Sequence, residues 1–463
     1  MAKLSAIQKT FHQATETDNV AKLKDIINKL VNSQDDEGKM PLLKTSNEET
    51  ITYLVKIGAN VHVEDTNGET ALHKAARNNQ VEVVKCLIEN GANVNVKDEI
   101  EMTPLHTAAY FGNVEVVKYL LENGATVNIK GKNEQTPLFN AAYQGEIEVV
   151  KYLIESGAEI DIKDDQHYTP LHAAVHQNKF EVVKLLIENG AMINLGNRNE
   201  ATPLHMASEN GYTEIVKLLI EKGAIIDVKD EYGYTPLHNA AYWGRFEIVK
   251  YLTENSAEID IKDDKLQTTL YGSVQENNIE IVEWLIENGA MINLRAMAKL
   301  TPLHLAAEGG PTEMIKLLIK NGASIDAKDK EHETPLHLAV QQNKLEFVKC
   351  LVENGASVNA RNKDNHTPHF LAAKLDFIDV VDYLTKIKKR KAESEPVEIF
   401  NSKDPCVMCF EPRNGLYVLL PCGHTSLCES CCIKITCKDD NSKCPTCRKP
   451  INSYNQIFFQ KPE

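Results

Sequence analysis

Thr103-Pro-Leu-His-Thr-Ala-Ala-Tyr-Phe-Gly-Asn-Val-Glu-Val-Val-Lys-Tyr-Leu-Leu-Glu-Asn-Gly-Ala125 is the stretch of sequence that decides the fold. Thr103 before Pro104 is typical of a helix N-cap followed by a proline in the first turn, where no hydrogen bond is lost. Gly124 after Asn123 is typical of a second helix that ends in a left-handed residue. The stretch therefore predicts two short helices joined by a turn.

This unit recurs along most of the chain. Its threonine appears every 33 residues, at Thr70, Thr103, Thr136, Thr169, Thr202, Thr235, Thr268, Thr301, Thr334 and Thr367, and proline follows eight of these ten. A constant period of this length is typical of a solenoid, in which each unit buries its apolar face against its neighbours. The sequence therefore predicts an all-α array.

The unit resembles the ankyrin repeat, and the resemblance spans about four fifths of the chain. It implies an all-α ankyrin-repeat solenoid of about twelve repeats, with regular repeats at residues 67–390. Before Thr70 the pattern weakens, because Met40-Pro-Leu lies 30 residues upstream instead of 33. We expect residues 1–66 to form degenerate N-terminal capping repeats.

The repeat that begins at Thr268 departs most from the pattern. Thr269 replaces proline, Tyr271 replaces histidine, and Ser273 and Val274 replace the pair of alanines. In the other units these alanines are small enough for neighbouring helices to approach closely. The repeat at Thr268 is therefore a candidate irregularity in the array.

Seven histidines share one position of the repeat, three residues after the threonine. They are His73, His106, His172, His205, His238, His304 and His337. A solenoid spaces equivalent residues one repeat apart, so they cannot converge on one metal ion or one substrate. We expect these histidines to be structural, and we expect Cys86 and Cys350 to act as small buried apolar residues.

The resemblance also implies where a protein substrate binds, namely on the concave face formed by the hairpin tips and the first helices. Aromatic residues make up only 6% of the chain, yet five fall at positions just after the alanine pair. Tyr and Trp are common hot spots of binding. The candidate substrate-binding residues are Tyr110, Phe111, Tyr143, Tyr242 and Trp243; the alternative is that some of them pack between repeats.

A second motif follows the repeats and contains nine of the eleven cysteines. It reads Cys406-x2-Cys409-x12-Cys422-x-His424-x3-Cys428-x2-Cys431-x12-Cys444-x2-Cys447. Zinc takes four tetrahedral ligands, and a two-residue gap lets a turn place two thiolates on one ion. The motif therefore predicts two structural zinc ions, whose binding supplies folding energy that so short a segment lacks.

Disulfide bonds are the alternative use of clustered cysteines. The first ten residues carry charge and no apolar segment, so they do not resemble a signal peptide. We therefore expect the chain in the reducing cytosol, where clustered cysteines bind metal ions more often than they form disulfides. Cys432 and Cys437 are additional to the seven cysteines and one histidine predicted as ligands, and Cys432 is an alternative ligand to Cys431.

The order of these ligands resembles the RING finger of ubiquitin ligases, and Pro421-Cys-Gly-His resembles the RINGs of inhibitor-of-apoptosis proteins. The resemblance places a RING domain at residues 404–450, after a linker at 391–403 and before a tail at 451–463. It implies interleaved sites. Cys406, Cys409, Cys428 and Cys431 would hold one ion, and Cys422, His424, Cys444 and Cys447 the other.

The resemblance implies a RING-type ubiquitin-protein ligase, which forms no covalent intermediate with ubiquitin. A conjugating enzyme would dock on Met408, Ile435 and Pro445, and Arg448 would be the linchpin that donates hydrogen bonds to both proteins. The array would recruit the substrate. The alternative is a non-catalytic adaptor whose zinc module only docks or dimerises.

The composition limits the other partners. The chain carries 51 Lys and Arg against 66 Asp and Glu, and an acidic surface repels nucleic acid. No apolar run approaches the roughly 20 residues that span a bilayer. We expect a cytoplasmic protein; the run 388–391 is either a nuclear import signal or a set of cations at a helix end. The resemblance to inhibitor-of-apoptosis RINGs implies that Phe458 and Phe459 support a RING homodimer; the alternative is that they fold back on their own zinc module or stack on the end of the array.

Overall fold

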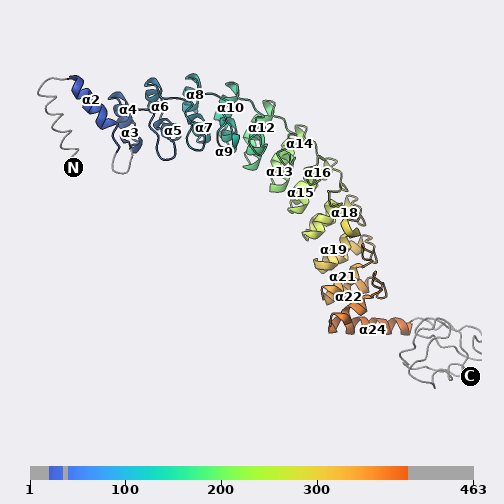
Figure 1. Cartoon of the computed structure of the whole chain (residues 1–463). Helices are drawn as coiled ribbons and strands as arrows, with labels where there is room; N and C mark the ends of the chain where they lie inside the picture. Colours follow the sequence, from blue (N-terminus) through green and yellow to red (C-terminus); the bar gives the residue numbers. More distant parts are fainter. Residues whose placement is uncertain (1–19, 35–39, 395–463) are drawn as a thin grey trace, which may run out of the picture. The chain divides into compact units, whose positions relative to one another are not determined.

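The computed structural model describes residues 20–34 and 40–394 (Figure 1). The chain divides into two compact units, and the boundary between them follows Val380. The first unit contains the predicted array. The predicted RING domain at 404–450 and the tail at 451–463 lie outside the described residues, as does the linker after Ser394.

Within the described ranges the chain forms helices joined by turns and hairpins. After α2 (Val20–Val31), the first helices of successive pairs are α3 (Pro41–Lys44), α5 (Ala71–Arg77), α7 (Pro104–Tyr110), α9 (Pro137–Gln144), α11 (Pro170–His176), α13 (Pro203–Asn210), α15 (Pro236–Tyr242), α17 (Thr269–Gln275), α19 (Pro302–Gly309), α21 (Pro335–Gln341) and α23 (Pro368–Lys374).

The second helices of these pairs have nine residues each, except for the last. They are α4 (Glu48–Lys56), α6 (Val81–Glu89), α8 (Val114–Glu122), α10 (Ile147–Glu155), α12 (Phe180–Glu188), α14 (Thr213–Glu221), α16 (Phe246–Glu254), α18 (Ile279–Glu287), α20 (Thr312–Lys320), α22 (Leu345–Glu353) and α24 (Ile378–Ser394). Two 3-10 turns, η1 (Lys132–Glu134) and η2 (Met297–Lys299), lie in the hairpins.

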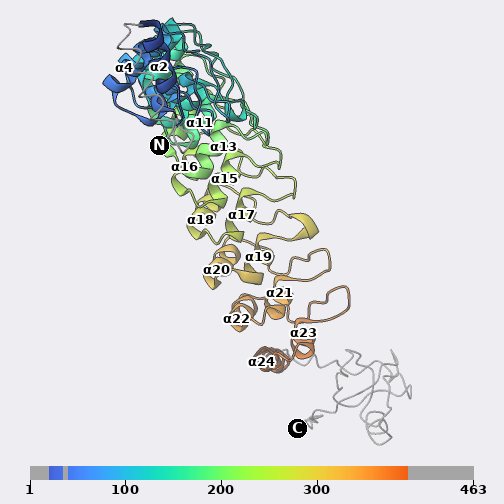
Figure 2. The same ribbon diagram turned by 60° about the vertical axis from the view of Figure 1, so that its left-hand side comes forward.

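From α3 to α23 each pair packs against the next, so the first helices form one row and the second helices another (Figures 1 and 2). This arrangement confirms the predicted solenoid. Its core repeats as well: in α7 and α8, Leu105, Ala108, Val116 and Leu120 are buried. Burying one leucine contributes about 2 kcal/mol, and the alanine allows the backbones of neighbouring helices to come close.

The degenerate repeats before Thr70 share one asparagine hydrogen-bonding pattern with the regular repeats. In a regular repeat, Asn95 Nδ2 donates to the carbonyl of Gly124 at 3.0 Å, and Asn95 Oδ1 accepts from the next repeat. Asn32 does the same with the carbonyl of Gly58 at 3.0 Å and with Asn60 N at 2.7 Å. Residues 20–34 therefore join the array as a repeat would.

Helix α24 continues through Ser394, so it overlaps the first residues of the predicted linker. The Lys, Arg, Ala and Glu residues in this stretch favour helix, and the first proline beyond it is Pro396. None of the helices in residues 20–34 and 40–394 combines the length and the apolar character needed to cross a membrane.

Candidate functional site

A threonine–histidine network joins each repeat to the next. Thr103 N donates to His106 Nδ1 at 3.2 Å, so the neutral ring carries its proton on Nε2. That Nε2 donates to the carbonyl of Gln135 in the next repeat at 3.0 Å. Burial lowers the pKa of His106 to about 4. The structural role predicted for this histidine position is therefore confirmed.

His238 is the exception among the seven histidines. The other six place Nε2 within hydrogen-bonding distance of a carbonyl 29 residues further along the chain, as His205 does with Tyr234 O at 3.0 Å. His238 Nε2 is buried and makes no hydrogen bond of normal geometry within the described part of the chain, although the backbone of Gln267, 29 residues further along, still interacts with the ring and raises its pKa against the larger effect of burial. The repeat that follows His238 is the irregular one at Thr268.

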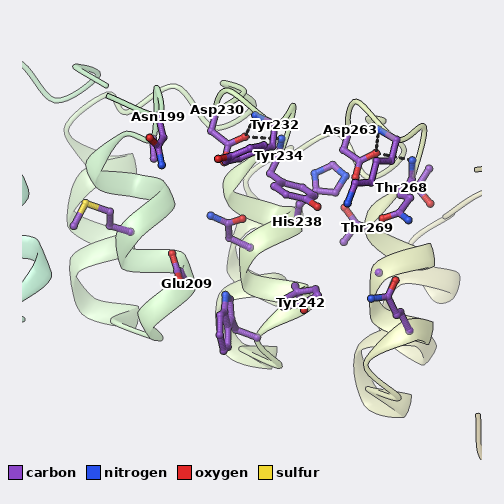
Figure 3. Close-up of a pocket in the computed structure, with 18 of the residues that line it drawn as sticks. Asn199, Glu209, Asp230, Tyr232, Tyr234, His238, Tyr242, Asp263, Thr268 and Thr269 are labelled. Carbon is purple, nitrogen blue, oxygen red and sulfur yellow. Dashed lines mark hydrogen bonds between the residues drawn. The ribbon is translucent and has the colours of Figure 1, made fainter. Parts of the chain in front are cut away.

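A pocket of about 500 Å³ lies at this irregularity (Figure 3). It is bounded by α13, α15 and α17 and by the hairpins that precede these three helices. We call it the Asp263 pocket. Its lining residues are Tyr168, Asn197, Asn199, Ala201, Met206, Glu209, Asp230, Tyr232, Tyr234, His238, Asn239, Tyr242, Trp243, Asp263, Lys265, Gln267, Thr268, Thr269, Gly272 and Gln275.

Three lining side chains have buried polar atoms without a hydrogen-bond partner in the described residues: His238 Nε2, Asp263 Oδ2 and Thr269 Oγ1. These residues are only 6%, 3% and 1% exposed. Figure 3 shows the His238 ring extending from α15 toward Asp263 and Thr269 of the next repeat. Such atoms are rare in folded proteins, because each costs about 1–3 kcal/mol when left unpaired.

The hairpin before α17 holds Asp263 in place. Its Oδ1 atom accepts hydrogen bonds from Lys265 N at 2.9 Å and from Gln267 N at 2.7 Å. Burial raises the pKa of the Asp263 carboxyl above its usual value, although these hydrogen bonds act in the opposite direction. Asp263 therefore has one satisfied oxygen and one unsatisfied oxygen.

Carboxylates and aromatic rings also line the rest of the pocket. Glu209 and Asp230 add two acidic side chains to the lining, against one cation, the exposed Lys265. Tyr232 and Tyr234 come from one hairpin, with ring centroids 6.4 Å apart. Acidic and aromatic groups together favour a cation.

The structure brings two of the five candidate aromatic residues to this pocket. Tyr242 and Trp243 lie at the end of α15, are 46% and 52% exposed, and place their ring centroids 5.6 Å apart. Tyr110 and Phe111 form a similar exposed pair at the end of α7, with centroids 5.2 Å apart, outside this pocket. Tyr143 is half-buried and stacks on His176.

Sequence reasoning did not identify Asp263, Tyr232, Tyr234 or Gly272 as site residues. The departures of the Thr268 repeat from the pattern, at Thr269 and Tyr271, were the available signal in the sequence. The sequence Tyr-Gly-Tyr at a hairpin tip was a second signal. Neither signal indicates a pocket until the repeats are stacked.

The predicted zinc ligands, docking residues and linchpin lie outside the described residues. In the ranges 20–34 and 40–394, no group of three His, Cys, Asp or Glu side chains could hold a metal ion. Cys86 and Cys350 are buried there, burial raises the pKa of each thiol, and their predicted structural role is confirmed. Seven cysteines and one histidine between 406 and 447 have the donor chemistry that zinc prefers.

Family models match both parts of the chain. The model described as ankyrin repeats in three copies matches residues 11–98, 42–131, 105–197, 171–263, 257–329 and 303–394. The model described as a zinc finger of C3HC4 type, or RING finger, matches residues 402–454. A RING finger implies zinc binding.

Curated relatives match over a short part of the chain. Human cell growth regulator with RING finger domain protein 1 is 39% identical over 82 residues, 17% of this chain and 21% of that protein. Mitochondrial E3 ubiquitin protein ligase 1 of Drosophila melanogaster is 36% identical over 75 residues, 16% and 20% of the two chains. E3 ubiquitin-protein ligase Mdm2 of Danio rerio is 38% identical over 71 residues, which are 13% of this chain and 16% of that protein.

The chain thus spans about a fifth or less of the length of these relatives. Among solved structures, the human ASB11 ankyrin repeat domain is 31% identical and covers 48% of this chain and 99% of its own, with a TM-score of 0.44. The ankyrin model matches continuously from residue 11 to residue 394. The chain therefore belongs to the ankyrin-repeat family, and it carries a RING-type zinc finger after its repeats.

Proposed function

We propose that this protein is a RING-type ubiquitin-protein ligase whose ankyrin array recruits a protein substrate. The observation that carries the proposal is the RING match at residues 402–454, which includes all eight predicted ligands and Arg448. Two of the relatives that match are named as E3 ubiquitin ligases. The array carries two exposed aromatic pairs at equivalent positions of two repeats, and these support the recruiting role.

The proposed chemistry is a transfer that the conjugating enzyme already performs. The amine of a substrate lysine attacks the thioester carbonyl of the loaded ubiquitin. An isopeptide bond forms, the thiol of the conjugating enzyme leaves, and the proton lost by the amine passes to solvent or to the leaving sulfur. The ligase contributes orientation, which removes the entropic cost of bringing the two reactants together.

Arg448 is the residue to which we assign the orienting contact. A guanidinium can donate to two carbonyl groups at once, so Arg448 can hold the ubiquitin and the conjugating enzyme in one pose. Met408, Ile435 and Pro445 would form the docking groove. Zinc would hold this surface together, with Cys406, Cys409, Cys428 and Cys431 at one site and Cys422, His424, Cys444 and Cys447 at the other.

Autoubiquitination with a panel of conjugating enzymes tests the proposal. We expect transfer by the full chain with at least one enzyme. Arg448→Ala should lower the rate by about 10-fold or more with nearly unchanged enzyme binding, because its contacts form around the activated ubiquitin. Met408→Ala should weaken docking itself. Wild-type rates in both variants, or no transfer with any enzyme, would favour the adaptor.

The recruiting role has a separate test. Tyr110→Ala and Trp243→Ala each remove an exposed aromatic side chain from a different repeat, so their effects on stability should be nearly additive. We expect the double variant to lose capture of the natural substrate and to keep autoubiquitination. Tyr53→Ala, an exposed tyrosine in α4, is the control. A double variant with full substrate affinity would place the site elsewhere.

A further inference from the structure

We propose that the Asp263 pocket binds a lysine or arginine side chain that a partner protein presents. The proposal concerns binding by the array and does not depend on ubiquitin transfer. It rests on an ion pair that the chain makes elsewhere, on three unpartnered buried atoms, and on the residues around them.

In another repeat of this chain, a lysine ammonium group pairs with the aspartate that is equivalent to Asp263. Lys74 Nζ lies 2.8 Å from Asp65 Oδ2 in the repeat at Thr70. Asp263 occupies the position of Asp65 six repeats further along, and the position of Lys74 is taken by Gly272. A Cβ atom placed on Gly272 would meet no atom within 4 Å. The Thr268 repeat therefore keeps the carboxylate and the space, but it lacks the ammonium group.

The unpartnered atoms also indicate a ligand. Asp263 Oδ2 needs a donor. His238 Nδ1 already accepts from Thr235 N at 3.2 Å, and His238 Nε2–H interacts with the backbone of Gln267 without a hydrogen bond of normal geometry, so it can take a further acceptor. A basic residue within a peptide supplies both, through its side-chain N–H groups and a backbone carbonyl. Thr269 Oγ1 can accept or donate. One basic residue could thus satisfy groups that the array leaves unpaired.

The surrounding residues suit this occupant. Glu209 and Asp230 extend the acidic lining, so a cation is attracted before it reaches Asp263. The rings of Tyr234 and Trp243 can pack on the aliphatic stem and attract the charged end. Lys265 is the one cation in the lining, and it forms no ion pair with Asp263 within the described residues.

Labelled peptide pools are the probe, with Lys, Arg, Met or Glu fixed at the centre and mixed residues on both sides. Fluorescence polarisation measures their affinity for the full zinc-loaded chain. We expect the Lys and Arg pools to bind at least about tenfold more tightly than the Met pool. The Glu pool should bind most weakly.

Asp263→Asn removes the charge and keeps the shape. Asn197 occupies the same repeat position and accepts both equivalent backbone hydrogen bonds, and Asn362 accepts the one from the residue four positions further along. We expect this variant to bind the Lys pool no better than the Met pool. Asp329→Asn is the matched control, because Asp329 makes equivalent hydrogen bonds outside the pocket.

Gly272→Lys is a second, independent variant. Its own ammonium group should pair with Asp263 and exclude the peptide, with a loss of affinity similar to that of Asp263→Asn. Leu305→Lys is its control, since Ala296 stands at the Asp263 position of that repeat. Equal binding of all pools, binding of none, or full affinity in folded Asp263→Asn and Gly272→Lys chains would overturn the proposal.

Discussion

Lys74 Nζ lies 2.8 Å from Asp65 Oδ2, and this ion pair joins a first helix to the hairpin before it. Burial raises the pKa of Asp65, but the hydrogen bonds from Lys74, Asn67 N and Glu69 N together lower it below its usual value. At Asp263 burial dominates and the pKa is raised. The same repeat position thus holds a stabilised carboxylate in one repeat and an uncompensated one in another.

Gly272→Lys should stabilise the array more than Gly272→Met. Both substitutions replace a helical glycine, and each should raise the free energy of unfolding by about 1 kcal/mol for that reason. Only lysine can also pair with the buried Asp263. We expect about 1 kcal/mol of further stabilisation, because the ammonium group would satisfy the unpaired Asp263 Oδ2 atom. Urea unfolding followed by circular dichroism measures both variants. The difference should disappear in an Asp263→Asn background; an unchanged difference would show that the pair does not form.

The array should lose stability as the pH falls from about 6.5 toward 4. Burial lowers the pKa of His106, His172 and His238 to about 4 from a usual value of 6.5. The unfolded chain therefore takes up protons in this range before the folded chain does. At pH 5 each of these histidines should cost about 2 kcal/mol relative to neutral pH. Urea unfolding at pH 7.5 and pH 5 measures the loss.

His172→Phe is the matched variant for this pH dependence. Phe139 is buried at the same position one repeat earlier, so the array already accepts a phenyl ring there. The variant should lose less stability between pH 7.5 and pH 5 than the wild-type chain. An identical loss would mean that His172 does not titrate as its burial requires.

Zinc removal should unfold the RING finger and leave the repeats helical. Thiolate and imidazole ligands lose protons on binding zinc, so chelator or acid removes the metal and its folding energy together. Elemental analysis should find about two zinc ions per chain, and chelation should change the helical circular dichroism little. Cys428→Ala should lower the zinc content, whereas Cys86→Ala should not. One zinc ion per chain in a freshly purified sample would contradict paired sites.

The residues after Asn455 should support self-association and ubiquitin transfer. Phe458 and Phe459 lie outside the described residues, and each could bury on the order of 150–250 Å² in a partner. The resemblance of Pro421-Cys-Gly-His to inhibitor-of-apoptosis RINGs implies that an aromatic residue in the tail of one subunit presses on the ubiquitin bound to the other, and we propose this role for the tail. Deleting residues 456–463 should lower both properties without loss of zinc. A monomeric truncated chain with full activity would exclude this trans mechanism.

Most of the array could be predicted from the sequence, because its signals are local. Thr103 caps a helix, Pro104 occupies its first turn, and Gly124 adopts a φ of 89° after the second helix. Each repeat packs only on its neighbours, so one unit and its period determine the stack. The zinc ligands could be predicted for a similar reason, since the spacing of Cys and His carries the coordination chemistry.

The Asp263 pocket was decided by tertiary structure. Its polar groups come from successive repeats, and each group alone looks like an ordinary member of its repeat. His238 has the same residue type as six other structural histidines, and only stacking on the irregular Thr268 repeat leaves its Nε2 atom without a hydrogen bond of normal geometry. Hydrogen-bond satisfaction depends on distances between separate segments, whereas helix formation depends on neighbours in the chain. The sequence by itself therefore determined the repeats and the zinc ligands, and the stacking of one repeat on the next determined the pocket.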